Sequence, residues 1–346
     1  MIRHHGYRTP ARVVTDSVAG CVESPTRVLL TPAARACANA QKGPQIVRLR
    51  RNLASVVPMA VMLLAVTACQ AATSVDMTDV PTDYVMEMAD ESDMPDEILE
   101  IRDRGRLVIG SKFDQPLTGL RDEATGRIEG FDAEIGRILA QRIFGYAAEG
   151  ENLDFIETIS SNREPYLRDG IADFILATYT ITEERKESVD FAGPYYVAGQ
   201  SIMTRVGEEI DEVEKLAGKR VCFADDSTSG ATIEQLVPTA QLRPMNNYDS
   251  CVTSLQAGRV DAVSTDNVIL YGFAKRFPGE FHISEELFTT EAYGVGLPHG
   301  SPELREFINS TLEEAYANGD WDRAFARTLE TGGAATPDEH PKIVRY

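Results

Sequence analysis

The sequence predicts an α/β protein built from two lobes, and three observations support this prediction. The chain has 346 residues, which is too long for a single hydrophobic core. Its content of hydrophobic residues is 43%, as in globular proteins. Short apolar stretches typical of buried strands alternate with longer amphipathic stretches, and this alternation indicates parallel sheets covered by helices.

The N-terminal part of the chain precedes the expected fold. Residues 1–46 show no clear periodicity, and we expect an untranslated extension with Val47 as the true start. Residues 47–68 carry arginines and then an apolar run that is too short to span a membrane comfortably. Small residues then precede Cys69 and form a lipobox. We therefore expect a lipoprotein signal peptide over 47–68 and a lipid on the thiol of Cys69.

An acidic segment without Lys or Arg follows, over residues 69–97. Like charges repel each other and keep a chain extended, so we expect this segment to be a spacer between membrane and fold. The formal net charge of the whole chain is −20. Such a charge excludes nucleic-acid binding through a phosphate-neutralising surface.

The first lobe is expected over residues 98–196. Its first strand, 105–110, leads to the loop residues Lys112 and Phe113. They follow the carboxyl end of the strand, where ligands bind in open α/β sheets. A helix comes next, and we expect Asp132 to be its N-cap.

The stretch 177–196 carries the strongest chemical signal. The hydroxyls of Thr178 and Thr180 come directly after a buried strand. An α-helix is expected to start at Thr182, with Arg185 in its first turn. Hydroxyl groups, free helix-terminal N–H groups and a guanidinium meet there, and together they suit a carboxylate.

The second lobe is expected over residues 197–288, and residues 289–346 return to the first lobe with C-terminal helices. In the second lobe, a strand over 219–224 leads to Thr228 at the start of a helix. A later strand leads to Asp266 in the same way.

Cysteine and histidine usage bounds the redox and metal chemistry. After Cys69 only Cys222 and Cys251 remain, and an even pair in an exported chain indicates a disulfide, with two buried thiols as the alternative. The later histidines are widely spaced, so we expect no metal and no cofactor. The chain lacks the common hydrolase, nucleotide-binding and metalloprotease motifs, so we expect no enzyme.

One stretch resembles the family-3 extracellular solute-binding proteins, the amino-acid receptors of ABC importers. Thr178, Thr180, Arg185 and the run 189–195 (Val-Asp-Phe-Ala-Gly-Pro-Tyr) fall on the family pattern in register. The resemblance extends over about 98–329. It implies the type II periplasmic-binding-protein fold, in which two mostly parallel sheets flanked by helices are joined by two hinge strands and close on one amino acid.

The resemblance also assigns roles. It implies that Arg185 clamps the α-carboxylate of the ligand, with hydrogen bonds from Thr180 and from the backbone at Thr178. It implies that Thr228 offers its N–H to the same carboxylate. Asp266 would take the α-ammonium, since an ionised carboxylate accepts hydrogen bonds from that group.

The side chain of the ligand is expected to be acidic. Lys112 and Arg163 follow strands of the first lobe, and cations at similar points take the side-chain carboxylate in glutamate- and aspartate-binding members. We therefore expect glutamate, with Phe113 either against its aliphatic part or packed in the core. Asp225 and Asp226 oppose this expectation, because an acid beside the ligand repels an anion unless it faces solvent.

The resemblance implies an exported monomer, lipid-anchored to the outer face of the plasma membrane, that serves the permease of an ABC importer. Three alternatives stay open. One is a prephenate-type or cyclohexadienyl dehydratase on the same fold, with Asp226 or Glu183 as general acid. Another is a receptor for a neutral polar amino acid such as glutamine or asparagine. A third is a ligand-binder that serves a separate signalling partner.

Overall fold

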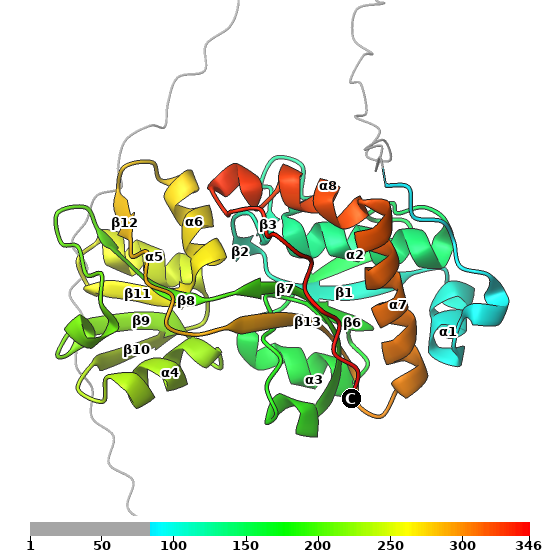
Figure 1. Cartoon of the computed structure of the whole chain (residues 1–346), viewed down its shortest axis with the longest axis horizontal. Helices are drawn as coiled ribbons and strands as arrows, with labels where there is room; N and C mark the ends of the chain where they lie inside the picture. The colour runs from blue at the N-terminus through cyan, green and yellow to red at the C-terminus, as the bar shows by residue number, and fades with distance from the viewer. Residues whose placement is uncertain (1–83) are drawn as a thin grey trace, which may run out of the picture. The chain divides into compact units, whose positions relative to one another are not determined.

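The computed structural model describes residues 84–346, which fall within one compact unit. The predicted extension, the signal peptide and Cys69 lie outside the described residues. Among residues 84–346, no helix combines the length and the hydrophobicity needed to cross a bilayer. The described chain forms two lobes, each with a five-stranded sheet and its own helices (Figure 1).

The first lobe contains most of the helices (Figure 1). Its elements are α1 (Asp96–Arg104), β1 (Leu107–Ser111), β2 (Asp114–Gln115), β3 (Gly119–Arg121), β4 (Ile128–Glu129), α2 (Phe131–Phe144), β5 (Leu153–Glu157), α3 (Arg163–Arg168), β6 (Phe174–Leu176), β7 (Val189–Ala198), β13 (Glu291–Pro298), α7 (Pro302–Asn318) and α8 (Asp320–Arg327). The sheet order is β5-β1-β6-β13-β7, and β2, β3 and β4 form a separate small sheet. β1 pairs in parallel with β5 and β6, whereas β13 is antiparallel to β6 and β7.

The second lobe repeats this plan. Its elements are β8 (Gln200–Arg205), β9 (Arg220–Ala224), α4 (Thr228–Leu236), β10 (Gln241–Met245), α5 (Tyr248–Gln256), β11 (Ala262–Asp266), α6 (Asn267–Arg276) and β12 (Phe281–Ile283). The sheet order is β10-β9-β11-β8-β12. β9 is parallel to β10 and β11, and β8 is antiparallel to β11 and β12.

Two connections join the lobes. The chain leaves the first lobe at the end of β7 and enters β8 after Gly199. It returns from β12 to β13, which pairs with β7 from Glu291 opposite Ala198 to Pro298 opposite Val189 (Figure 1). Neighbouring connections of this kind act as a hinge. The predicted two-lobed α/β fold of type II is therefore confirmed.

An aromatic cluster fixes the C-terminal helices to the hinge strand β7. Trp321 of α8 stacks on Phe325, with ring centroids 5.3 Å apart, and meets Phe131 of α2 edge-on at 5.5 Å. Its indole N–H donates to the carbonyl oxygen of Tyr195 in β7 at 2.8 Å. The cluster thus makes the last helices part of the first lobe.

Residues 84–94 pack against the first lobe, so the prediction of a spacer over 69–97 is wrong for this part. The side chains of Tyr84 and Met86 are buried in the core of the lobe. The backbone N–H groups of residues 85 and 86 donate to the buried carboxylate of Asp320 at 2.9 and 2.8 Å. The scattered apolar residues of the acidic segment gave no periodic signal, and the carboxylate that holds the backbone here, Asp320, lies more than two hundred residues away.

Cys222 of β9 and Cys251 of α5 are joined by a disulfide, with their Cα atoms 5.5 Å apart. Both residues are fully buried. The bridge ties the middle of α5 to the sheet of the second lobe. The start of this helix, Tyr248, thereby takes a fixed place beside the pocket described next.

Candidate ligand-binding site

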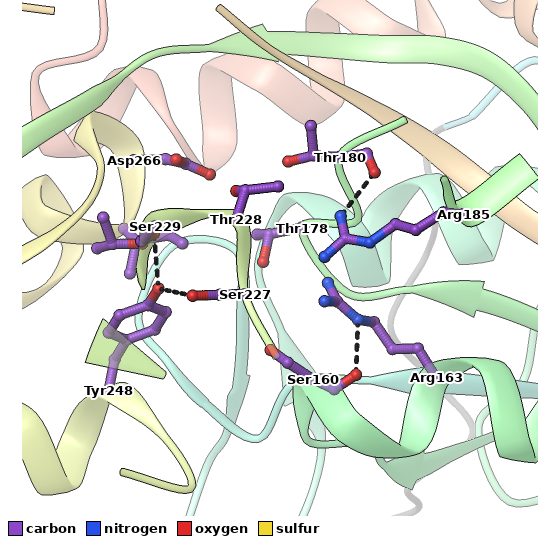
Figure 2. A pocket seen from close by; sticks show the side chains of 12 residues that line it. Ser160, Arg163, Thr178, Thr180, Arg185, Ser227, Thr228, Ser229, Tyr248 and Asp266 are labelled. Carbon is purple, nitrogen blue, oxygen red and sulfur yellow. Dashed lines mark hydrogen bonds between the residues drawn. The ribbon is translucent and has the colours of Figure 1, made fainter. Parts of the chain in front are cut away.

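A small pocket lies between the two lobes, where strands of both sheets end (Figure 2). Six of the residues predicted to bind ligand line it. They are Arg163, Thr178, Thr180, Arg185, Thr228 and Asp266. Six further residues that the sequence did not single out complete the lining. These are Ser160, Ser227, Ser229, Tyr248, Thr265 and Ile269.

Arg185 lies on a single 3₁₀ turn, η3 (Arg185–Glu187), and not in the first turn of an α-helix. The predicted helix is absent because the chain enters β7 immediately afterwards. The guanidinium is oriented by the carbonyl oxygen of Thr180, which accepts from Nη1 at 2.7 Å. The Thr182 hydroxyl accepts from the backbone N–H of Arg185 at 3.2 Å. At this point the site therefore offers a guanidinium and hydroxyls, without helix-terminal N–H groups.

Two guanidinium groups extend into the pocket from the same side, those of Arg163 and Arg185 (Figure 2). Both lie over the ring of Tyr179, at 4.2 and 4.9 Å from its centroid. Both donate to the backbone carbonyl oxygen of Asp226, at 3.0 and 3.2 Å. Within residues 84–346, neither guanidinium forms an ion pair with a carboxylate. Two cations without a counter-ion make this wall of the pocket a receptor for anions.

Burial accounts for the electrostatics of this wall. Arg163 is only 3% exposed. Burial, together with the neighbouring charge of Arg185, lowers the pKa of Arg163 to about 9. It remains a cation at neutral pH, in an environment that disfavours its charge. A bound carboxylate would relieve that cost.

Asp226 does not place its carboxylate in the pocket. Its backbone has φ of 57°, in the left-handed region that favours glycine, and this conformation directs the carbonyl oxygen to the two guanidinium groups. The side chains of Asp225 and Asp226 are exposed. The two acids that seemed to oppose an anionic ligand therefore face solvent.

The opposite side of the pocket is acidic. Asp266 is buried, and its Oδ2 accepts from the hydroxyl of Tyr293. Its Oδ1 is also buried and has no hydrogen-bond partner among the described residues. The nearby Glu291 accepts from the Thr228 hydroxyl at 3.1 Å. Burial and the charge of Glu291 raise the pKa of Asp266 to about 7. An unpartnered carboxylate oxygen in a pocket wall suits a cationic donor such as an ammonium.

Asp132 supports this site from behind instead of capping α2. The N-cap position of that helix is Gly130, whose φ of 119° and close approach to Thr118 suit glycine. The buried carboxylate of Asp132 accepts from the backbone N–H of Thr178 at 2.8 Å and from the hydroxyl of Tyr195 at 2.7 Å. Burial raises the pKa of Asp132 to about 6. The predicted N-cap is thus wrong, and the acid holds the loop that carries Thr178.

Lys112 and Phe113 lie outside the pocket lining. Lys112 is buried behind it, and its Nζ donates to the Ser160 hydroxyl at 3.0 Å. Burial and the charge of Arg163 lower the pKa of Lys112 to about 7. Phe113 faces a separate groove, where the guanidinium of Arg121 lies 5.7 Å from its ring centroid. Phe113 thus does not line the pocket, and its contact with a ligand stays a prediction.

Some of the missed residues carried a sequence signal. Ser227 and Ser229 flank Thr228 at the start of α4, so the pattern that indicated one of them points to all three. Tyr248 carried none, although its hydroxyl lies 3.3 Å from the Ser227 hydroxyl and 3.2 Å from the Ser229 hydroxyl. It reaches the pocket because β10 pairs in parallel with β9, so the starts of α5 and α4, which follow these strands, lie at the same edge of the sheet.

Comparison with known proteins places this site in a family context. Residues 107–330 match the profile of the bacterial extracellular solute-binding proteins, family 3. The glutamine-binding protein GlnH of an ABC transporter from Bacillus subtilis (strain 168) is 36% identical over 243 residues, which cover 70% of this chain and 88% of that protein. The glutamate-binding protein GluB of Corynebacterium efficiens is 34% identical over 249 residues, covering 69% and 84%.

Solved structures agree. An ancestral arginine-binding protein bound to glutamine matches with a TM-score of 0.60 and 33% sequence identity, over 65% of this chain and 98% of that one. The two sequence relatives are transport binding proteins and not enzymes. The chain therefore belongs to the bacterial extracellular solute-binding proteins of family 3, as a substrate-binding protein of an amino-acid ABC importer.

Proposed function

We propose that the chain binds an acidic amino acid, glutamate, between its lobes and delivers it to the permease. The observation that carries the proposal is the charge of the pocket lining, which contains two arginines and one acid, Asp266. The α-carboxylate and the α-ammonium of any amino acid neutralise one guanidinium and Asp266. The second guanidinium then requires a second carboxylate, and glutamate supplies it.

In this proposal each charged group has one partner. Arg185, with Thr180 and Thr228, binds the α-carboxylate, and Asp266 binds the α-ammonium through its free oxygen. Arg163 binds the side-chain carboxylate. Lys112 strengthens that end of the pocket through Ser160, which lies between its ammonium and the cavity.

A neutral ligand is the second candidate, because the relative from Bacillus subtilis is named for glutamine. The amide oxygen of glutamine can accept a hydrogen bond from Arg163 but leaves its charge without a counter-ion. The relative from Corynebacterium efficiens is named for glutamate. The two candidate ligands, glutamate and glutamine, are therefore distinguished by how much Arg163 contributes to the affinity for each.

Replacing Arg163 by methionine is expected to weaken glutamate binding by about 30-fold and glutamine binding only a few-fold. Methionine keeps an unbranched apolar stem over Tyr179 and removes the charge. Calorimetric titration with glutamate, aspartate, glutamine and asparagine measures both effects, and wild-type protein should favour glutamate over glutamine. Arg168→Ala is the matched control, because Arg168 lies on the same helix but pairs with Asp169 at the surface. An equal loss for glutamate and glutamine contradicts the acidic specificity.

A dehydratase activity has less support. It requires a general acid in the pocket, and the sequence offered Asp226 or Glu183 for that role. Both side chains are exposed and neither carboxylate lines the pocket. The pair Arg163 and Arg185, together with the free oxygen of the buried Asp266, supports binding of an amino acid without turnover.

We further propose that the chain is exported as a monomer and held at the membrane by a lipid on Cys69. The lipobox before Cys69 supports this. Because residues 84–94 pack on the first lobe, they do not serve as part of the spacer in this proposal. We expect Cys69→Ser to release the protein from the membrane fraction while its amino-acid affinity stays unchanged. Retention of the variant in that fraction would contradict the anchor.

A further inference from the structure

A second contact between the lobes lies outside the ligand pocket. Asp114, in β2 of the first lobe, accepts hydrogen bonds at Oδ2 from the backbone N–H groups of Tyr248 and Asp249, at 2.9 and 3.3 Å. These are the first two residues of α5 in the second lobe. We propose that Asp114 is a latch that holds the lobes closed, and that it sets ligand affinity without touching the ligand.

The start of α5 explains why the latch requires the closed form. The first N–H groups of a helix have no partner within the helix. At α5 the side chain of Asn247 accepts from the N–H of Ser250 at 3.0 Å, which satisfies one of them. The N–H groups of Tyr248 and Asp249 find their acceptor in the other lobe. They have this protein partner only while the lobes are together, and water must replace it when they separate.

Tyr248 couples the latch to the ligand pocket. Its backbone N–H meets Asp114, while its side chain lines the pocket between the lobes. On the first lobe, Asp114 comes two residues after Lys112, whose ammonium contacts the pocket residue Ser160. Asp114 and Tyr248 are therefore each close in the chain to residues at the pocket. Closure of the lobes forms the pocket and this contact at the same time.

The surrounding surfaces are in close contact as well. Gly272 of α6 lies against the backbone of Pro116, and a Cβ at this glycine would come within 2.1 Å of the Pro116 carbonyl oxygen. Lys275 of the same helix donates to the hydroxyl of Thr331 at 2.6 Å. At Gly272 itself there is no room for a methyl group, although a groove lined by Asp114, Pro116 and Lys275 opens beside this contact. The latch thus lies beside a point of close contact between the lobes, at Gly272 and Pro116.

The contact of Asp114 with α5 requires a hydrogen-bond acceptor more than it requires a negative charge. Burial raises its pKa, while the ammonium of Lys112 and the two N–H groups act in the opposite direction. What the closed form requires is an acceptor for two N–H groups that have left water. A neutral side chain with an oxygen can therefore replace the carboxylate in part, and an apolar one cannot.

A contact made only in the closed form contributes to ligand affinity, because bound ligand is held in that form. Asp114→Ala leaves both N–H groups without an acceptor on closure. We expect the Kd for glutamate to rise about tenfold, mainly through faster dissociation. Asp114→Asn keeps one acceptor oxygen and should recover about half of this loss on a logarithmic scale.

The experiment combines titration calorimetry, stopped-flow dissociation and thermal unfolding. The melting temperature of ligand-free Asp114→Ala should equal that of wild type, while its increase on adding ligand should be smaller. Glu123→Gln, which removes an exposed acid from the adjacent turn between β3 and β4, is the matched control and should change neither Kd nor dissociation rate. Gly272→Ala is a second variant, because it favours α6 alone but obstructs closure. It should also weaken binding.

An unchanged Kd and dissociation rate in Asp114→Ala would overturn the latch. A melting temperature of the ligand-free protein that falls with the affinity would overturn it too, since that result indicates a fold defect. Where wild-type protein takes glutamine instead of glutamate, the same series is measured with glutamine. Failure of the acidic specificity is therefore distinguishable from failure of the latch.

Discussion

Replacing Arg185 by alanine is expected to weaken the binding of every α-amino acid by at least about 100-fold. Its guanidinium is oriented by the Thr180 carbonyl oxygen and has no carboxylate partner within residues 84–346. Removal of the cation would leave the α-carboxylate of the ligand in a closed pocket without its charge partner, and such a loss exceeds that of an exposed pair. Titration with glutamate and glutamine measures the effect on both ligands.

Comparing the variants of Arg185 and Arg163 shows which arginine binds the α-carboxylate and which binds the side-chain carboxylate of the ligand. Loss of Arg185 should affect acidic and neutral ligands alike, because all share the α-carboxylate. Loss of Arg163 should affect acidic ligands most. If Arg185→Ala weakened only glutamate and Arg163→Met weakened both, the two arginines would have exchanged roles. Arg168→Ala again serves as the control, and circular dichroism verifies that each variant is folded.

The affinity for amino acids is expected to fall about tenfold for each pH unit below 7. In the ligand-free protein, burial and Glu291 raise the pKa of Asp266 to about 7. Below that pH the carboxylate is protonated, and its proton must leave before it can pair with the α-ammonium. Asp266→Asn should bind about 100-fold more weakly than wild type at pH 7.5 and should lose this pH dependence. Calorimetric titration of both proteins from pH 5.5 to 8 measures it.

Lowering the pH weakens ligand binding through Asp266, but through the same group it stabilises the fold of the ligand-free protein. Its pKa in the folded state lies above the value of about 3.9 in an unfolded chain. Between these values the folded protein binds one more proton than the unfolded chain, so this group stabilises the fold as the pH falls from 7.5 toward 5. The difference in free energy of unfolding between wild type and Asp266→Asn isolates that contribution. A pH-independent difference, together with pH-independent binding, would contradict a buried, titrating Asp266.

The sequence by itself determined the fold class and half of the residues that line the pocket. Alternating strand and helix patterns report where chain segments are buried, and residues that follow the carboxyl ends of strands meet at one edge of a sheet. This reasoning placed Thr178, Thr180 and Arg185, and the family resemblance added Thr228 and Asp266; all of them line the pocket. These residues are local signals, because each stands directly beside a strand or a turn that the pattern reveals.

Only the tertiary structure decided which distant groups become partners. Asp132 was predicted as an N-cap from its neighbours, yet it holds Thr178 and Tyr195. From the sequence, the carboxylate of Asp226 was expected to repel an anionic ligand. In the structure its side chain is exposed, and its left-handed backbone directs the carbonyl oxygen to the two arginines. Periodicity and local propensity contain no information about such pairs.

The contact between Asp114 and the start of α5 shows the physical reason. The two segments are separated by more than one hundred residues and belong to different lobes. They meet because β9 pairs with β10 and β11 in one sheet, and because the two connecting strands bring that sheet against the first lobe. An unpaired N–H group at a helix start is visible in the sequence, but the acceptor that satisfies it is chosen by the order of strands and the closure of the lobes.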